Sequence, residues 1–144
     1  MVPLTVCEVL RDLPAAEGKT IPILGRYSFR ERGRWVGQQT CEPPLGTDGN
    51  PGPQLILLED SKDGPKLPEN FELDGAALRT KLQAMLKHTA LGKFRFGSTD
   101  YDRWAVIYGR VEARKGEDAK KAAANLIYRG DAVIVTLSLE RYLP

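Results

Sequence analysis

The side chains that most often build metal and catalytic centres are scarce in this chain. Among its 144 residues there is one histidine, His88, and there are two cysteines, Cys7 and Cys41. A zinc site needs three or four histidine or cysteine ligands at short, regular spacings, and neither cysteine belongs to a CxxC pair. The three residues together match no metal-binding pattern, so we expect no metal site.

Motifs that bind nucleotides and cofactors are missing as well. The sequence contains neither GxxxxGK[ST] nor a GxGxxG that follows an expected strand, and the glycine-rich segment 46–52 is interrupted by proline. Glu59, Asp60 and Asp63 stand in an expected turn, where Asp side chains bond their own backbone. Catalysis by two carboxylates needs a facing pair in different environments, and no such pair is visible. We therefore predict that the protein is not an enzyme and binds no cofactor.

Long apolar runs and an excess of one charge are also absent. No run is long enough to cross a bilayer as a helix, and no basic start followed by an apolar stretch marks a signal peptide. This pattern favours a cytoplasmic protein if Met1 is the native start, and a periplasmic or exported protein if a signal peptide has been removed. The formal net charge of +2 is too small to imply a polyanionic partner, so any electrostatic argument must rest on local clusters.

The bulk composition fits a single globular domain over residues 1–144. The hydrophobic content of 42% and the charged content of 28% are ordinary for such proteins. A chain of this length is expected to fold around one core.

The N-terminal part predicts a short helix followed by a curved strand. Thr5 and Glu8 form a capping box at the helix start, and Pro14 limits the helix to about two turns. In residues 20–30, apolar and polar side chains alternate with the period of a strand. Gly25 inside that strand predicts a bulge or a sharp bend.

The later elements follow in an order typical of one small fold. After a hairpin come strands over 35–41 and 54–60, a helix capped by Asp74, a strand over 103–114 with a bend at Gly109, and a closing segment over 126–143. The buried stripe of the helix is expected to hold Leu78, Leu82, Met85 and Leu86. One face of the closing segment is expected to hold Val133, Val135, Leu137 and Leu139.

Three strands, a helix and two strands are the order of the OB-fold, a five-stranded, partly open Greek-key barrel. We predict a mainly β, OB-fold-like barrel with an N-terminal helix and a helix between strands three and four. Another small β-barrel or an α+β sheet with the same order is the alternative.

The segment "TVCEVLRDLPAAEGKTIPILGRYSFRERGRWV" resembles the start of small, uncharacterised bacterial OB-fold-like proteins. In that group a "TVCEVL" helix precedes a "GRY" strand, and a cysteine closes the next strand. The resemblance covers about the first third of the chain and the remainder only by element order. It implies an OB-like barrel and no assigned activity. Members of the group often look exported, and the missing signal peptide is a departure from that pattern.

Two clusters of basic residues are the main candidates for a binding site. In an OB-fold, the loops between strands one and two and between strands four and five flank the face that binds oligonucleotides. Here these loops are the basic segments 30–34 and 114–121, and aromatic rings beside the first loop, Tyr27, Phe29 and Trp35, offer surfaces for base stacking unless the core holds them. The candidate binding residues are Arg30, Arg32, Arg34, Trp35, Arg114, Lys115 and Lys120.

Composition and motifs lead to two hypotheses about function. The first is a non-enzymatic binding module that uses the open face of the barrel for an unidentified protein or small ligand. The alternative is a protein that binds single-stranded nucleic acid through the two basic loops. Fold alone does not decide between them, because OB barrels support many functions.

The two cysteines leave two interpretations open. Cys7 and Cys41 are two semi-buried thiols if the protein works in a reducing compartment. They are a disulfide between the N-terminal helix and the second strand if the protein is exported.

Overall fold

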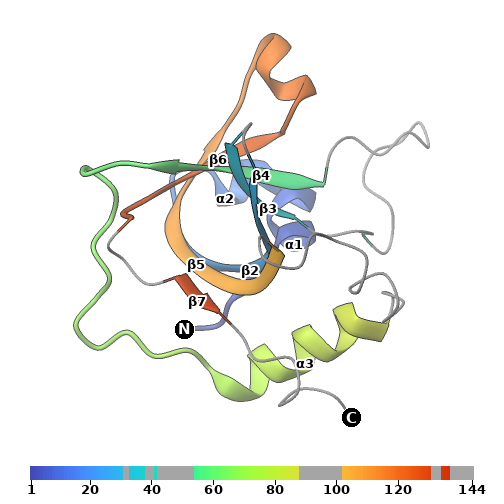
Figure 1. Ribbon diagram of the computed structural model, residues 1–144, viewed down its shortest axis with the longest axis vertical. Coiled ribbons are helices and arrows are strands. Elements are labelled where there is room, and N and C mark those ends of the chain that lie inside the picture. The colour runs from blue at the N-terminus through green and yellow to red at the C-terminus, as the bar shows by residue number, and fades with distance from the viewer. Residues whose placement is uncertain (31–32, 38–40, 42–53, 88–101, 131–133, 137–144) are drawn as a thin grey trace.

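The computed structural model describes residues 1–30, 33–37, 41, 54–87, 102–130 and 134–136. Within these ranges the chain is mainly β, with short helices before and between the strands (Figure 1). The strands are β1 (Leu4–Thr5), β2 (Thr20–Arg30), β3 (Gly33–Gly37), β4 (Leu55–Asp60), β5 (Asp102–Ala113), β6 (Ala124–Tyr128) and β7 (Ile134–Thr136). The helices are α1 (Val6–Arg11), α2 (Leu13–Ala16), α3 (Gly75–Lys87) and the 3₁₀ helix η1 (Gly116–Lys120).

Five of these strands close into a barrel. Their order is β2-β3-β4-β6-β5, and β5 pairs again with β2 to complete the ring. Neighbouring strands are antiparallel except β4 and β6, which are parallel. In chain order, α3 lies between β4 and β5, the third and fourth strands of the barrel. The predicted OB-like barrel with an N-terminal helix and a helix between these strands is therefore confirmed.

The closing segment differs from the prediction of one strand over 126–143. β6 ends at Tyr128, and β7 pairs with the first half of β5, at Ala105–Ile107, beside the barrel. The Gly130 N–H donates a hydrogen bond to Asp60 Oδ1 at 2.7 Å, which turns the chain after Tyr128. Of the side chains predicted to share one face, Val135 belongs to β7, and Val133, Leu137 and Leu139 lie outside the described residues.

Of the bulge or sharp bend predicted at Gly25, the bulge is wrong, and the bend predicted at Gly109 also involves no bulge. The β2–β5 register runs without a skipped residue from Thr20 opposite Arg110 to Ser28 opposite Asp102. A Cβ on Gly25 would lie 2.5 Å from Val36 Cγ2, and one on Gly109 would lie 2.7 Å from the Ile127 carbonyl oxygen. Glycine is therefore required at both positions because neighbouring atoms leave no room for a side chain.

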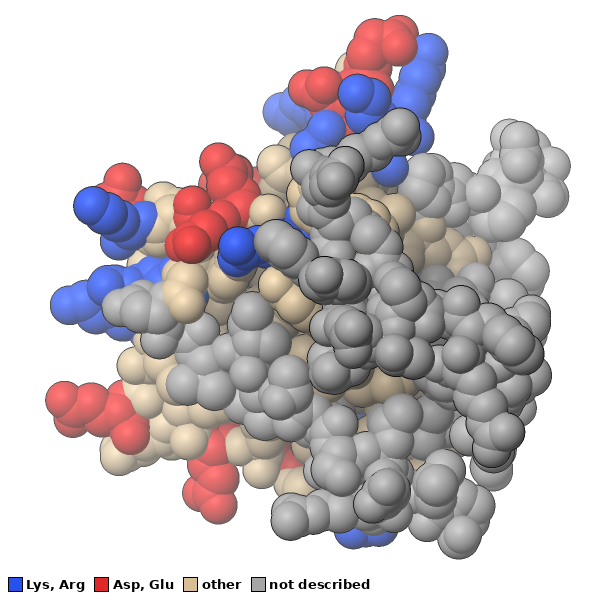
Figure 2. All heavy atoms as spheres, viewed as in Figure 1, with Lys and Arg blue, Asp and Glu red and all other residues tan. Residues whose placement is uncertain are grey.

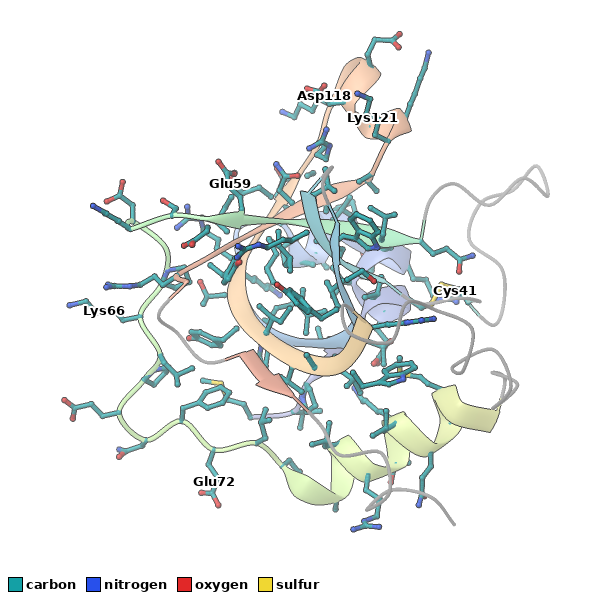
Figure 3. All side chains as sticks on the ribbon, viewed as in Figure 1. Cys41, Glu59, Lys66, Glu72, Asp118 and Lys121 are labelled. Atoms are coloured by element: carbon teal, nitrogen blue, oxygen red, sulfur yellow. A yellow bond between two sulfur atoms is a disulfide. The ribbon has the colours of Figure 1, made fainter. Side chains whose placement is uncertain are left out.

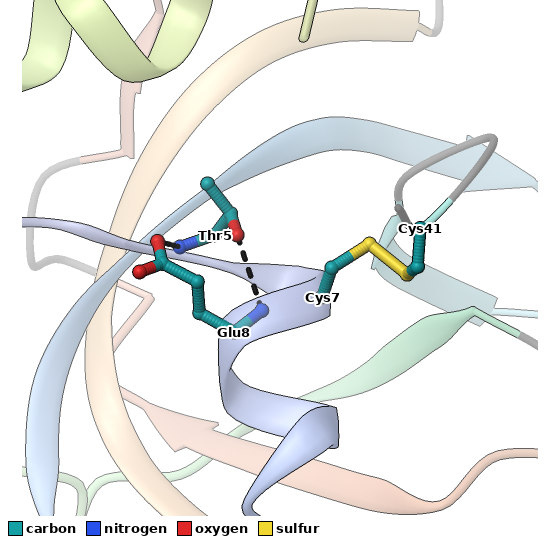
Figure 4. The surroundings of a disulfide bond; sticks show 4 residues. All are labelled: Thr5, Cys7, Glu8 and Cys41. Atoms are coloured by element: carbon teal, nitrogen blue, oxygen red, sulfur yellow. Dashed lines mark hydrogen bonds between the residues drawn. A yellow bond between two sulfur atoms is a disulfide. The ribbon is translucent and has the colours of Figure 1, made fainter. Parts of the chain in front are cut away.

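The interior of the barrel is the main core, and the N-terminal helices close one end of it. Ile23, Val36, Ile56 and Leu126 are fully buried there together with Val6 of α1. The predicted capping box starts α1: the Glu8 N–H donates to Thr5 Oγ1 at 3.1 Å, and the Thr5 N–H donates to Glu8 Oε1 at 3.0 Å (Figure 4). α1 ends at Arg11, before Pro14 is reached, and Pro14 lies in the first turn of the second short helix, α2, where proline is tolerated.

A second core lies outside the barrel, where α3 covers β2 and β5. The Ala77 N–H donates to Asp74 Oδ1 at 3.0 Å, so Asp74 caps the helix as predicted. The buried residues of this cluster are Leu78, Leu82 and Met85 of α3 with Leu24, Trp104 and Val106 of the strands. The Leu86 side chain lies outside the described residues. In the described part of the chain, the opposite outer side, formed by β3, β4 and β6, carries no helix that packs on it in this way.

Cys7 and Cys41 form a disulfide (Figure 4). Both are buried, at 6% and 2% exposure, and their Cα atoms are 5.5 Å apart. The predicted second strand over 35–41 is shorter than expected, since β3 covers Gly33–Gly37 and Cys41 itself is in no strand. The bond therefore joins α1 to the chain beyond the end of β3.

Candidate binding face

The register of the barrel aligns three side chains across the outer side of β3, β4 and β6, on which no described helix packs. Trp35 of β3 stands opposite Leu57 of β4, and Leu57 stands beside Asn125 of β6. All three are half-buried. With Leu55 and the exposed Glu59 of β4, they form what we call the binding face: Trp35, Leu55, Leu57, Glu59 and Asn125.

Trp35 points outward and is not part of the barrel core. Its neighbour Val36 is fully buried inside, and successive residues of a strand face opposite sides. A Cβ on Gly37 would lie 3.8 Å from Trp35 Cδ1, so the indole lies along the outer surface over this glycine. The predicted aromatic residue of the site is thus placed where a partner can contact it.

Tyr27 and Phe29 are the other two aromatic residues that the sequence offered for base stacking. Tyr27 is partly buried and packs against the barrel core, which leaves little of its ring for a ligand. Burial raises the pKa of Tyr27, and the charge of Arg34 opposes part of that rise. The Phe29 side chain lies outside the described residues.

Arg34, a predicted contact residue, turns toward the barrel interior. It shares a side of β3 with Val36, and its Nη1 donates a hydrogen bond to the Tyr128 hydroxyl at 3.1 Å. Tyr128 is 1% exposed. Tyr128 raises the pKa of Arg34, first through this hydrogen bond and then through electrostatic attraction. Arg34 therefore stabilises the end of the barrel opposite α1.

Buried apolar side chains of the described strands lie in the interior of the barrel. Side chains of the strands fill its centre (Figure 3), with α1 at one end and Arg34 with Tyr128 at the other. The interior is thus a core, and the outer side of β3, β4 and β6 is the candidate surface for a macromolecular partner.

The second basic loop is held together by its own ion pairs. Arg114 donates from Nη1 to Asn125 Oδ1 at 2.8 Å and from Nε to the Asp118 carbonyl oxygen at 3.0 Å. Lys120 Nζ lies 3.0 Å from Glu117 Oε1 in an exposed pair. Arg114 thus fixes Asn125 on the binding face, and internal acidic groups already neutralise much of the charge of this loop.

On the face shown in Figure 2, the described Lys and Arg side chains lie interleaved with Asp and Glu and form no continuous basic stripe. The hairpin that contains η1 projects from the barrel and carries Lys and Arg beside Asp and Glu, with Asp118 and Lys121 near its tip (Figure 3). Lys115 is exposed at its base. The Arg30 side chain and Arg32 lie outside the described residues.

The two predicted loops lie at opposite ends of the binding face. Arg30 pairs with Gly33 at one end of the barrel strands, whereas Ala113 pairs with Ala124 at the other end. β6 alone separates these ends by roughly 13 Å, at about 3.3 Å per residue. The loops flank the face, and of their described basic residues Arg34 lies at one end, whereas Arg114, Lys115 and Lys120 lie at the other.

Four of the five members of the face, Leu55, Leu57, Glu59 and Asn125, were not among the predicted binding residues. Leu57 belongs to the continuous apolar run "LILL", in which no alternation distinguishes an outer from an inner position. Asn125 occurs once between apolar residues, and only the register of β4 with β6 brings it beside Leu57.

Within the described ranges, no group of three or more His, Cys, Asp or Glu side chains is arranged to hold a metal ion. No helix in those ranges has both the length and the apolar character needed to span a membrane. Comparisons with protein-family models, curated proteins and solved structures gave no match. The resemblance to bacterial OB-fold-like proteins stays a prediction, and the case for function rests on the geometry of this chain.

Proposed function

We propose that this chain is a non-enzymatic OB-fold binding module that takes a protein or peptide partner on its binding face. The observation that supports this most directly is the Trp35–Leu57 pair, two large, half-buried apolar side chains side by side on an outer side of the barrel where no described helix packs. Aromatic and aliphatic anchors surrounded by polar groups are typical of protein-recognition surfaces. Here Glu59 and Asn125 supply the polar surroundings.

Charge favours this partner over a polyanion. Arg34 is engaged with Tyr128, Arg114 with Asp118 and Asn125, and Lys120 with Glu117. A surface that binds phosphates needs several cations directed at the ligand. Glu59 on the face itself would repel a phosphate backbone.

The disulfide supports an oxidising compartment, such as the periplasm or the exterior of the cell. Disulfides persist there and are rare in the cytosol. The test is a thiol assay on protein purified from its natural host without reductant and then denatured. We expect no free thiol, and two reactive thiols would contradict the assignment of compartment without affecting the binding face.

A displayed library of random peptides, selected on the folded protein, tests the binding face. We expect selected peptides to bind by fluorescence anisotropy and to lose most of their affinity for Leu57→Glu and Trp35→Ala. Lys121→Glu, on the projecting hairpin, is the matched control and should bind as the parent does. Circular dichroism checks that each variant is folded. Equal binding by Leu57→Glu, or failure to select any peptide, would contradict the proposal.

Single-stranded nucleic acid is the second candidate, supported by the outward Trp35 between two basic loops. It predicts that labelled single-stranded DNA or RNA binds with an affinity that falls steeply as salt rises. Arg32→Glu combined with Lys115→Glu should abolish that binding. Arg34 is unsuitable for this test because its loss would disturb Tyr128. Lack of binding at low salt would exclude this candidate.

A further inference from the structure

A small cavity lies between the N-terminal helices and the start of β2, separate from the binding face. Its volume is about 250 Å³. Val9 and Ala16 are buried in its wall, and Leu4 and Ile21 are half-buried there. The complete lining is Leu4, Glu8, Val9, Asp12, Ala15, Ala16, Lys19 and Ile21. The cavity therefore has an apolar floor, and its charged residues are exposed at the rim.

Of the two carboxylates at the rim, Glu8 is already engaged. Its Oε1 accepts from Lys81 Nζ at 2.9 Å and from the Thr5 N–H at 3.0 Å. Its side chain is directed back to the start of α1 (Figure 4). Glu8 therefore belongs to the architecture of the cavity and is not available to a ligand.

Asp12 and Lys19 are the charges that remain available. Asp12 precedes α2 at the position of a capping residue, yet its side chain makes no capping hydrogen bond. Among the residues that the structure describes, neither the Asp12 carboxylate nor the Lys19 ammonium has a hydrogen-bond or ion-pair partner. One negative and one positive group therefore border the same apolar cavity.

We propose that this cavity binds a small apolar zwitterion, such as an α-amino acid with an aliphatic side chain. The aliphatic group would occupy the floor formed by Val9, Ala16 and Ile21. The ammonium would approach Asp12, and the carboxylate would approach Lys19. The volume is slightly below the usual range for drug-sized ligands, roughly 300–1,000 Å³, which fits a molecule of this size.

The expected affinity is modest. Exposed ion pairs contribute little because water screens them, and a ligand with few atoms can bury little surface. We expect a dissociation constant in the millimolar range, which is suited to measurement by chemical-shift changes.

The test is a titration of the ¹⁵N-labelled protein with L-leucine at neutral pH, followed by amide chemical shifts. We expect saturable shifts at residues that line the cavity. N-acetyl-L-leucine lacks the cation, L-leucinamide lacks the anion, and glycine lacks the apolar group, so each should bind more weakly than leucine. The proposal is overturned if leucine causes no saturable shifts in this region, or if any of the three analogues binds as tightly.

Substitutions at the cavity provide a second measurement. Asp12→Asn and Lys19→Met should each weaken leucine binding about twofold to fivefold, the effect of losing one exposed ion pair. Ala15→Leu, at the exposed rim, should block the cavity. Asp63→Asn and Lys121→Met remove matched charges elsewhere and should leave binding unchanged. Parent-like binding by all three cavity variants would overturn the assignment. Failure of this proposal would leave the peptide-binding face untouched, because the two sites share no residue.

Discussion

At the scale of single residues, close contact between backbones determines which side chains the barrel tolerates. Gly25 lies where β2 faces Val36 of β3 and Val6 of α1, and its missing side chain lets the helix approach the strand. A position of this kind tests whether α1 is part of the core or only rests on its surface.

Replacing Gly25 by alanine should destabilise the protein by about 1–3 kcal/mol, the usual cost of overpacking a core. The added Cβ would lie 2.5 Å from Val36 Cγ2 and 2.9 Å from Val6 Cγ2. Urea denaturation measures the change. Gly75→Ala is the control, because an added Cβ there meets nothing within 4 Å and alanine is favoured in a helix. Equal stabilities of the two variants would show that β3 and α1 do not pack as closely around Gly25 as described.

Glu8 joins α1 to α3 and should make stability depend on pH. Burial alone would raise its pKa, but hydrogen bonds from Lys81 and Thr5 and the charge of Lys81 lower it below the ordinary 4.5. The folded protein therefore holds this proton more weakly than the unfolded chain. The stabilisation is complete above the unfolded pKa and is lost as pH falls through the lower, folded value.

We expect the parent protein to lose more stability than Glu8→Gln when the pH is lowered from neutral to below 4.5. Urea midpoints at a series of pH values provide the comparison. Glu117→Gln, in the exposed pair with Lys120, should follow the parent curve. A Glu8→Gln curve parallel to that of the parent would contradict the role of this ion pair.

At the scale of elements, the disulfide holds α1 against the end of the barrel that the N-terminal helices close. It connects residues that are 34 positions apart, and it adds a covalent link to the packing of Val6 and Val9. A crosslink of this span restricts mainly the unfolded chain, and the stabilisation that it provides increases with the length of the loop that it closes.

Cys7→Ser combined with Cys41→Ser should lower the free energy of unfolding by about 3–4 kcal/mol, as expected for a loop of this length. Denaturation with and without dithiothreitol measures the effect, and the double variant should be insensitive to the reductant. If reduction leaves the parent midpoint unchanged, the bond contributes no stability.

At the scale of the whole molecule, one pair of strands joins the two cores. Ile23 of β2 is buried inside the barrel, whereas its neighbour Leu24 is buried under α3. Ile107 and Val106 of β5 are divided in the same way. Loss of either core should therefore disturb the strands that support the other.

Leu82→Ala in α3 should cost about 2–5 kcal/mol, as for other large-to-small core changes, and unfolding should stay a single transition. Far-ultraviolet circular dichroism follows the loss of secondary structure. Tryptophan fluorescence follows the packing around Trp104 under α3 and around Trp35 on the other side of the barrel. Two separated transitions would show that α3 and the barrel are independent.

The sequence predicted the fold more fully than the site, and particular residues explain why. The capping box of Thr5 and Glu8 and the cap at Asp74 are local patterns, so they could be recognised without knowledge of the tertiary structure. The inward turn of Arg34 depends on Tyr128, which is 94 positions away. Long-range register likewise decides that Leu57 and Asn125 lie side by side, and no local pattern contains that information.

The pairing of β2 with β5 joins segments that are far apart in the sequence. Thr20 lies opposite Arg110, so a chain made from its N-terminus exposes the apolar side of β2 until most of the later sequence exists. Cys41 is available long before β5. A bond to Cys7 formed at that stage would keep α1 against the unfinished barrel and shield Ile23 until the last strands arrive. Besides stabilising the finished fold, the disulfide would then keep apolar side chains of the partly folded chain out of water.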